Sequence, residues 1–115
     1  MKKIFRTFTE WFSRKYYNYY FCADIPERIA EKAFYIVGEK SHPWVMVFRC
    51  PCGCKQIIQL NLLKEGDPRW SFRISTRKEI NVRPSVWRTK GCKSHFVIRN
   101  SKIDWVTDKW SFTTD

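Results

Sequence analysis

The chain has 115 residues, enough for one domain with a modest core, and its 43% hydrophobic and 17% aromatic content excludes an intrinsically disordered polypeptide. It has 22 Lys and Arg residues against 11 Asp and Glu residues, and this net charge of +11 favours anionic partners. It shows neither a signal-peptide pattern nor the run of about 20 apolar residues that a membrane span needs, so we expect a cytoplasmic protein with reduced cysteines.

Residues 1–32 are predicted to form a basic, aromatic helical segment. Apolar and aromatic side chains recur at helical spacing between Met1 and Phe21, and lysines and arginines surround this stripe. Asp24 and Glu27 have the spacing of a capping box, which predicts a second, short helix at Pro26–Lys32. We expect the stripe to pack on the rest of the domain and do not expect the helix to contact a membrane.

Residues 33–115 are predicted to form a small, mainly antiparallel β domain. Short runs of β-branched and aromatic residues alternate with turn signals, which is typical of short strands. Pro84 is expected to end one of them, because proline cannot donate to a β-ladder. The expected strands are Ala33–Val37, Trp44–Phe48, Gln56–Leu63, Trp70–Ile74, Ile80–Val82, His95–Ile98 and Lys102–Val106. The predicted fold class is therefore α+β.

Alternation along these segments predicts which side chains form the core. Ile58, Leu60 and Leu62 share one face of their strand, because successive side chains point to opposite faces. Four tryptophans in the β domain are expected to pack in the core rather than to stack on nucleic-acid bases: Trp44, Trp70, Trp87 and Trp105.

Three of the five cysteines lie in one short turn. Cys50, Cys52 and Cys54 alternate with Pro51 and Gly53. Proline fixes φ and glycine permits a tight turn, so backbone N–H groups can point at thiolate sulfur. This composition is typical of a metal-binding turn.

A second ligand pair is expected at Cys92 and His95, which have C-x2-H spacing. Structural zinc takes four nitrogen or sulfur ligands in a tetrahedron, usually as two pairs from two turns. The spacing does not choose which two of Cys50, Cys52 and Cys54 complete the set, so the spare thiol could be reactive. Because at least four soft ligands are available, we predict a closed structural zinc site in the β domain rather than a catalytic one.

Several polar and charged residues flank the proposed metal turns and could bind a ligand or a partner surface. For Ser85 the simpler interpretation is a polar residue that caps a turn, and Cys22 is not expected to bind metal. His42 is expected at the surface. The candidate residues for ligand or partner binding are Arg49, Lys55, Arg83, Ser85, Arg88 and Lys93.

The order and spacing of three motifs resemble a small bacterial and phage family of uncharacterised proteins with an expected metal site. The motifs are CPCGC at Cys50–Cys54, RPSVWR at Arg83–Arg88 and GCKSHF at Gly91–Phe96, and the resemblance spans about Phe34–Trp105. Members are often encoded beside ubiquitin-like conjugation genes, so the resemblance implies a ubiquitin-like protein or its conjugation enzymes as partner. The chain has Lys55 where the family commonly has glycine, which removes no candidate ligand.

We interpret the sequence as a zinc-binding accessory or adaptor protein, rather than an enzyme, linked to a bacterial ubiquitin-like conjugation or defence system. Its basic surface would bind an acidic protein partner. Two alternatives remain open. One is a nucleic-acid-binding zinc protein, and the other is a zinc- or thiol-dependent enzyme in which His95 serves as the base for a cysteine.

Overall fold

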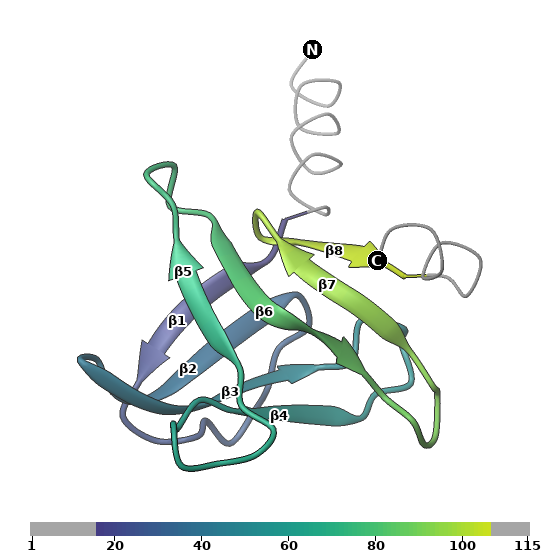
Figure 1. The fold of residues 1–115 in the computed structure, drawn as a ribbon, viewed down its shortest axis with the longest axis horizontal. Helices are drawn as coiled ribbons and strands as arrows, with labels where there is room; N and C mark the ends of the chain where they lie inside the picture. Colours follow the sequence, from purple (N-terminus) through teal and green to yellow (C-terminus); the bar gives the residue numbers. More distant parts are fainter. Residues whose placement is uncertain (1–15, 107–115) are drawn as a thin grey trace.

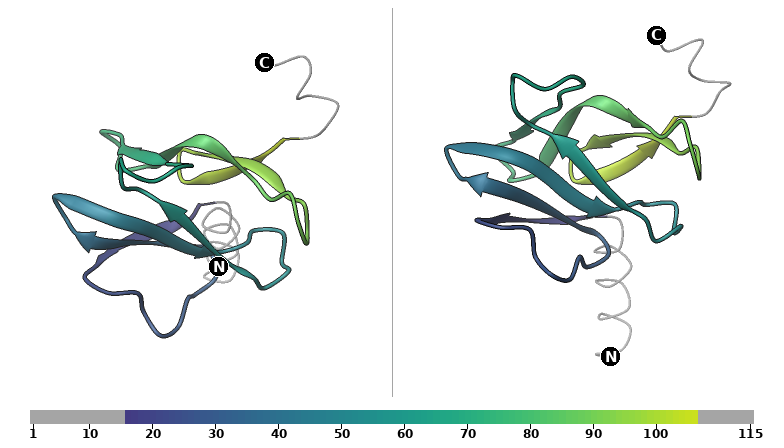
Figure 2. Two further views of the ribbon diagram at one scale, coloured as in Figure 1. Left: turned by 60° about the horizontal axis from the view of Figure 1, so that its bottom comes forward. Right: turned by 90° about the horizontal axis from the view of Figure 1, so that it is seen from below.

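The computed structural model describes residues 16–106, which form two four-stranded β-sheets that lie one over the other (Figures 1 and 2). The strand order is β1-β2-β3-β4 in the first sheet and β5-β6-β7-β8 in the second. All neighbouring strands are antiparallel except β1 and β2. The strands are β1 (Asn18–Cys22), β2 (Ala33–Glu39), β3 (His42–Arg49), β4 (Ile57–Asn61), β5 (Ser71–Ile74), β6 (Ile80–Trp87), β7 (His95–Arg99) and β8 (Lys102–Trp105).

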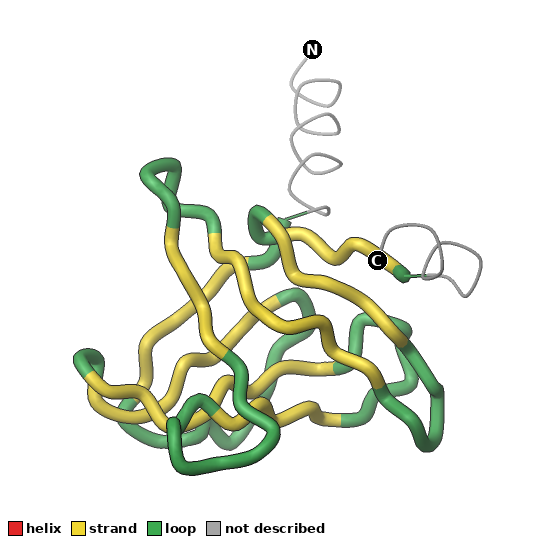
Figure 3. Tube along the Cα trace, viewed as in Figure 1, coloured by secondary structure: helices red, strands yellow, loops and turns green. Residues whose placement is uncertain are grey.

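The prediction of an α+β fold with an N-terminal helical segment is wrong for the residues that the structure describes. Between residues 16 and 106 there are only strands and loops (Figure 3), so this part is all-β and has no helix that could span a membrane. Asn18–Cys22 forms β1, and Pro26–Lys32 is a loop. Pairing with β2 gives the β1 backbone the hydrogen bonds of a ladder, so Asn18–Cys22 is a strand and not the end of the predicted first helix. The rest of the predicted first helix, residues 1–15, lies outside the described residues.

The seven predicted strands are confirmed as β2 to β8, with one difference. Strand β6 continues past Pro84, which was expected to end it. The register of β6 against β7 shifts between Val82 and Val86. Proline is tolerated in this bulge because a residue outside the regular ladder needs no N–H donor there.

The core lies between the two sheets. Phe34, Phe48 and Phe96 are fully buried, and the Phe48 ring centroid lies 5.0 Å from that of Phe34 and 6.3 Å from that of Phe96. Phe34 and Phe48 belong to the first sheet and Phe96 to the second, so these rings join the layers. The predicted buried face of β4 and the residues after it is confirmed for Ile58, Leu60 and Leu62.

The prediction that the four strand tryptophans pack in the core is wrong for three of them. Trp44, Trp87 and Trp105 expose 44%, 65% and 50% of their surface, and only Trp70 packs half-buried against the core. Alternation assigns a residue to a face without saying which face is buried. Trp87 pairs with half-buried His95 on the outer face of the second sheet. Trp105 instead pairs with the buried Phe96, and its side chain is exposed because β8 is an edge strand.

Candidate functional site

The turn that follows β3 carries three of the cysteines. Cys50 begins the turn and donates its backbone N–H to the Gln56 carbonyl at 2.8 Å, while Gly53 donates to the Cys50 carbonyl at 3.3 Å. Gly53 has a φ of 91°, a left-handed conformation that favours glycine. The turn therefore folds back on itself and brings Cys52 and Cys54 beside Cys50.

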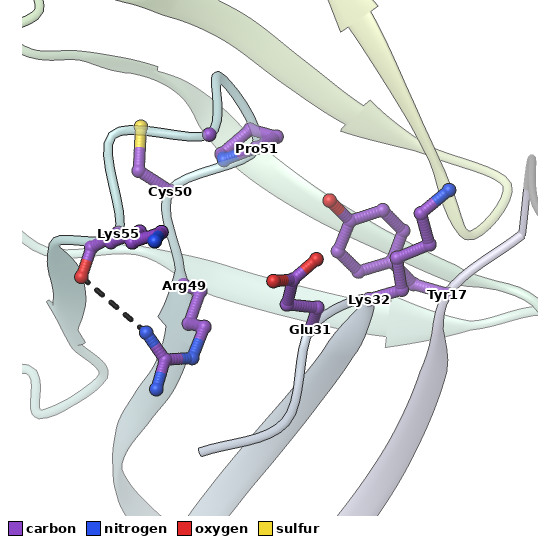
Figure 4. A pocket seen from close by; sticks show the side chains of 8 residues that line it. Tyr17, Glu31, Lys32, Arg49, Cys50, Pro51 and Lys55 are labelled. Carbon is purple, nitrogen blue, oxygen red and sulfur yellow. Dashed lines mark hydrogen bonds between the residues drawn. The ribbon is translucent and has the colours of Figure 1, made fainter.

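Arg49 connects this turn to the loop between β1 and β2. Its Nε donates to the Ile29 carbonyl at 2.5 Å, and its guanidinium also donates to the Lys55 carbonyl at 3.4 Å (Figure 4). A small pocket of about 100 Å³ lies beside the turn, with Tyr17 and Glu31 on its other wall. Arg49 and Lys55 are two of the residues predicted to bind a ligand or partner. In the structure the side chain of Arg49 and the backbone carbonyl of Lys55 form a hydrogen bond that supports the turn.

Cys92 completes a cluster of four thiols. The loop between β6 and β7 and the turn after β3 meet at the same end of the two sheets (Figure 1), and the Sγ atoms of Cys50, Cys52, Cys54 and Cys92 lie within 4.8 Å of one another. Cys50 Sγ is 3.4 Å from Cys52 Sγ and 3.6 Å from Cys92 Sγ. Tetrahedral zinc with Zn–S bonds of about 2.3 Å places its sulfur atoms about 3.8 Å apart. The four cysteines can therefore hold a metal ion, and the structure brings together all three thiols of the first turn, not two.

The surroundings of the thiols influence their ionisation. The Ser94 hydroxyl lies 3.2 Å from Cys92 Sγ and lowers the pKa of the Cys92 thiol to about 6. The same hydroxyl lowers the pKa of Cys52, whereas burial raises the pKa of Cys50 to about 11. Cysteine binds metal as the thiolate, so Ser94 favours the ligating form at two of the four positions.

His95 does not lie in the thiol group. It begins β7, and its Nε2 is 2.9 Å from the hydroxyl oxygen of Ser85 on β6. The ladder pairs Trp87 directly with His95, and their rings stack at a centroid separation of 5.0 Å and an angle of 13°. A metal-ligand role for His95 stays a prediction, and the contact with Ser85 gives this imidazole another partner.

The bulge in β6 presents Ser85 to its partner. Residues 83–85 stand between the paired positions Val82 and Val86, where the ladder is irregular, and bulges of this kind re-aim side chains. Trp70 Nε1 donates to the Ser85 carbonyl at 3.3 Å and holds the backbone there. Ser85 and His95 are both half-buried. A serine hydroxyl at hydrogen-bond distance from a histidine is the arrangement of an activated nucleophile and its base.

One loop links the thiol cluster to the Ser85–His95 pair. Residues 88–94 connect the strands that carry the two members of the pair, and Cys92 and Ser94 lie in this loop. Arg88 N–H donates to the Ser94 carbonyl at 2.7 Å, and the Arg88 guanidinium donates to Gln56 Oε1 at 2.7 Å. Hydrogen bonds therefore join the two ends of this loop to each other and join the loop to the first cysteine turn. A metal in the cluster would hold in place the end of the β6–β7 hairpin that carries the pair.

The other predicted site residues are placed as follows. Arg83 and Lys93 are exposed, and Arg88 is half-buried with Nη1 out of contact with water and with no hydrogen-bond partner among the described residues. Cys22 lies on β1 outside the thiol cluster, and His42 is exposed as predicted. The sequence prediction named both Ser85 and His95 but not their pairing. The available signal was a serine and a histidine on two strands that one short loop connects.

A comparison with protein-family models gives a match over most of the chain. The family described as "Bacterial ubiquitination-like system serine protease (BubE)" matches residues 21–106, which include β2 to β8, the thiol cluster and the Ser85–His95 pair. No curated protein and no solved structure matches the chain.

Proposed function

This chain belongs to the BubE family of bacterial ubiquitination-like systems, and we propose that it is a serine protease in which Ser85 is the nucleophile and His95 the general base. The observation that carries the proposal is the 2.9 Å separation between Ser85 Oγ and His95 Nε2. This separation is within the range at which a base can accept the hydroxyl proton. The partial exposure of both residues leaves them within reach of a substrate.

The chemistry follows from this geometry. Ser85 Oγ attacks the carbonyl carbon of the scissile bond while its proton passes to His95 Nε2. The tetrahedral intermediate collapses, the C–N bond breaks, and the leaving amine takes the proton from Nε2. A water molecule then attacks the acyl-serine ester, giving one proton to His95, and Ser85 regains its proton as the ester bond breaks.

Trp87 would help to orient the base. In serine proteases the histidine must be held in one rotamer for its nitrogen to face the serine. Here the indole of Trp87 lies nearly parallel to the His95 ring and covers one of its faces. This contact limits rotation of the imidazole and supports the orientation in which Nε2 faces Ser85.

We propose that the thiol cluster holds zinc and that the zinc is structural. Four thiolates in a tetrahedron are a preferred ligand set for Zn²⁺. A site with four protein ligands has no open position for water or substrate, so the metal would take no part in bond cleavage. It would stabilise the loop that connects β6 to β7. In this assignment Cys50, Cys52, Cys54 and Cys92 are the ligands and His95 is left free to serve Ser85.

The partner predicted from the sequence becomes the proposed substrate. We expect a ubiquitin-like protein of the same system, or a conjugate of it, to be cleaved, and the net charge of +11 suits an acidic protein. The Ser85–His95 contact favours an enzyme over the adaptor role, and it favours serine over a cysteine as the nucleophile, because Nε2 faces Ser85. The cytoplasmic location and the role in bacterial defence stay predictions.

The proposal is tested by cleavage of a fusion protein. The ubiquitin-like protein of the conjugation system is joined through its C-terminus to a reporter and incubated with the full-length, zinc-loaded chain. We expect cleavage at the junction, inhibited by the serine reagent phenylmethylsulfonyl fluoride and resistant to brief treatment with iodoacetamide, because bound thiolates react slowly. A fusion that stays intact, or one whose cleavage iodoacetamide stops and the serine reagent does not, would contradict a serine protease.

A further inference from the structure

A groove of about 850 Å³ crosses the second sheet beside the Ser85–His95 pair. Its walls come from β5, β6 and β7. Arg83, which lines it, stands two residues before Ser85 in β6, and Val97, which also lines it, stands two residues after His95 in β7. On both strands the groove therefore begins next to the Ser85–His95 pair.

The register of the sheet places arginines across this groove. Ser71 pairs with Arg83, and Arg73 pairs with Asn81 on the next outward row of β6. Arg99 of β7 also lines the groove, beyond Val97. All three arginines are exposed, whereas Val82 and Ile98 between them point into the core. The groove is therefore on the outer face of the sheet, and a cation stands on each of its three strands.

The charges of this groove are only weakly compensated within the described part of the chain. The described residues that line it include three arginines and no carboxylate. Asp104 on β8 lies 3.2 Å from Arg99, but both side chains are about half exposed and the pair is weak. Within residues 16–106, Arg73 and Arg83 have no ion pair. Guanidinium groups bind carboxylates through two parallel hydrogen bonds, which suits acidic side chains of a bound segment.

We propose that this groove binds an extended acidic segment of the substrate beside its scissile bond, an inference that rests on the proposed protease function. Residues two apart in an extended chain are separated by about 7 Å, which is also the spacing of successive outward rows on β6. Of two carboxylates at positions i and i+2 of the segment, one would then lie beside Arg83 and the other beside the next outward row, which pairs Arg73 with Asn81. A nucleic acid fits less well, because the aromatic residue among the described lining residues, Phe72, is half-buried and offers no open stacking platform.

Binding is tested with the full-length Ser85→Ala chain, so that no peptide is cleaved during the measurement. Two fluorescein-labelled peptides are titrated by anisotropy at low salt, one with two glutamates separated by one residue and one with glutamines in their place. We expect the acidic peptide to bind at least about tenfold more tightly, as one good charge-assisted contact would give. The added Arg73→Gln/Arg83→Gln pair should remove this difference, and Arg28→Gln/Lys64→Gln, which changes two exposed cations away from the groove, should keep it.

The outcomes separate this inference from the protease itself. Equal binding of the two peptides, or the same loss in the control variant, would overturn the acidic groove, as would tighter, arginine-dependent binding of a single-stranded oligonucleotide. Cleavage of the fusion protein by the wild-type chain, without any preference for acidic flanking residues, would overturn the groove and leave the nucleophile assignment standing. Arginine-dependent binding of the acidic peptide without any cleavage by the wild-type chain would support the groove and contradict the protease.

Discussion

Replacing Ser85 by alanine should lower the kcat for cleavage of the fusion protein by about 10⁴-fold or more, because the variant has no hydroxyl to form the acyl-enzyme. Such a loss corresponds to about 5.5 kcal/mol in the activation free energy. His95→Ala should cause a similar loss, and the double variant should lose little more, since a nucleophile and its base act as a unit. The measurement is single-turnover cleavage followed on a gel.

The chain offers matched controls for both substitutions. His42 is the second of its two histidines and is exposed, and Ser41 is an exposed serine of a turn. Ser41→Ala and His42→Ala should therefore retain full activity. Loss of one hydrogen bond at Ser85 costs about 1 kcal/mol, so the melting temperature of Ser85→Ala should fall only slightly. A Ser85→Ala variant that folds and cleaves at the wild-type rate would show that another residue is the nucleophile.

Removal of the metal should lower both the melting temperature and the cleavage activity, and this is the second large effect that we expect. We expect about one zinc per chain by elemental analysis, and its loss in Cys50→Ser and Cys92→Ser, because each substitution removes one of the four proposed ligands. Structural zinc contributes a large part of folding free energy in small domains. A loss of only about 3 kcal/mol would lower the melting temperature of a domain of this size by about 12 °C. Cleavage activity should fall with it, because the proposed zinc would stabilise the loop that connects Ser85 on β6 to His95 on β7.

Cys22 and His95 make this measurement specific. Cys22→Ser should keep its zinc and its melting temperature, because Cys22 lies outside the thiol cluster. His95→Ala should also keep its zinc while losing activity, which separates the base from the ligands. Freshly reduced protein without bound metal would contradict the zinc site. A chelated protein with an unchanged melting temperature would also contradict a structural zinc site. Retention of zinc in Cys92→Ser would exclude Cys92 as a ligand.

Most of the strands and part of the core could be predicted from local patterns in the sequence. The alternation of Ile58, Leu60 and Leu62 predicted a buried face, and the density of cysteines around Cys50 predicted a cluster that Cys92 completes. Both signals are local or depend on a rare residue type. The predicted helix was wrong at Asn18–Cys22, because β1 is stabilised by its pairing with β2, a strand that begins eleven residues after β1 ends. Such a contact is not visible within a single segment.

The Ser85–His95 pair depends on strand register. The spacing of Cys92 and His95 suggested two ligands on one turn, but β7 begins at His95 and directs its side chain toward β6. Which residue it meets there is decided by the pairing of Trp87 with His95 and by the bulge before Val86. Neither feature has a signature in the sequence, and Pro84 suggested that the strand would end before Ser85 was reached.

The most direct test of the proposed nucleophile is covalent labelling with a fluorophosphonate probe. The full-length, zinc-loaded chain is incubated with the probe, digested, and mapped by mass spectrometry, with the Ser85→Ala and His95→Ala variants treated in parallel. We predict one adduct, on Ser85, that is lost in Ser85→Ala and strongly slowed in His95→Ala, because the probe reacts with a serine activated by its base. An unlabelled wild-type chain, or an adduct on another serine such as Ser94 that persists in Ser85→Ala, would contradict the assignment of Ser85 and His95.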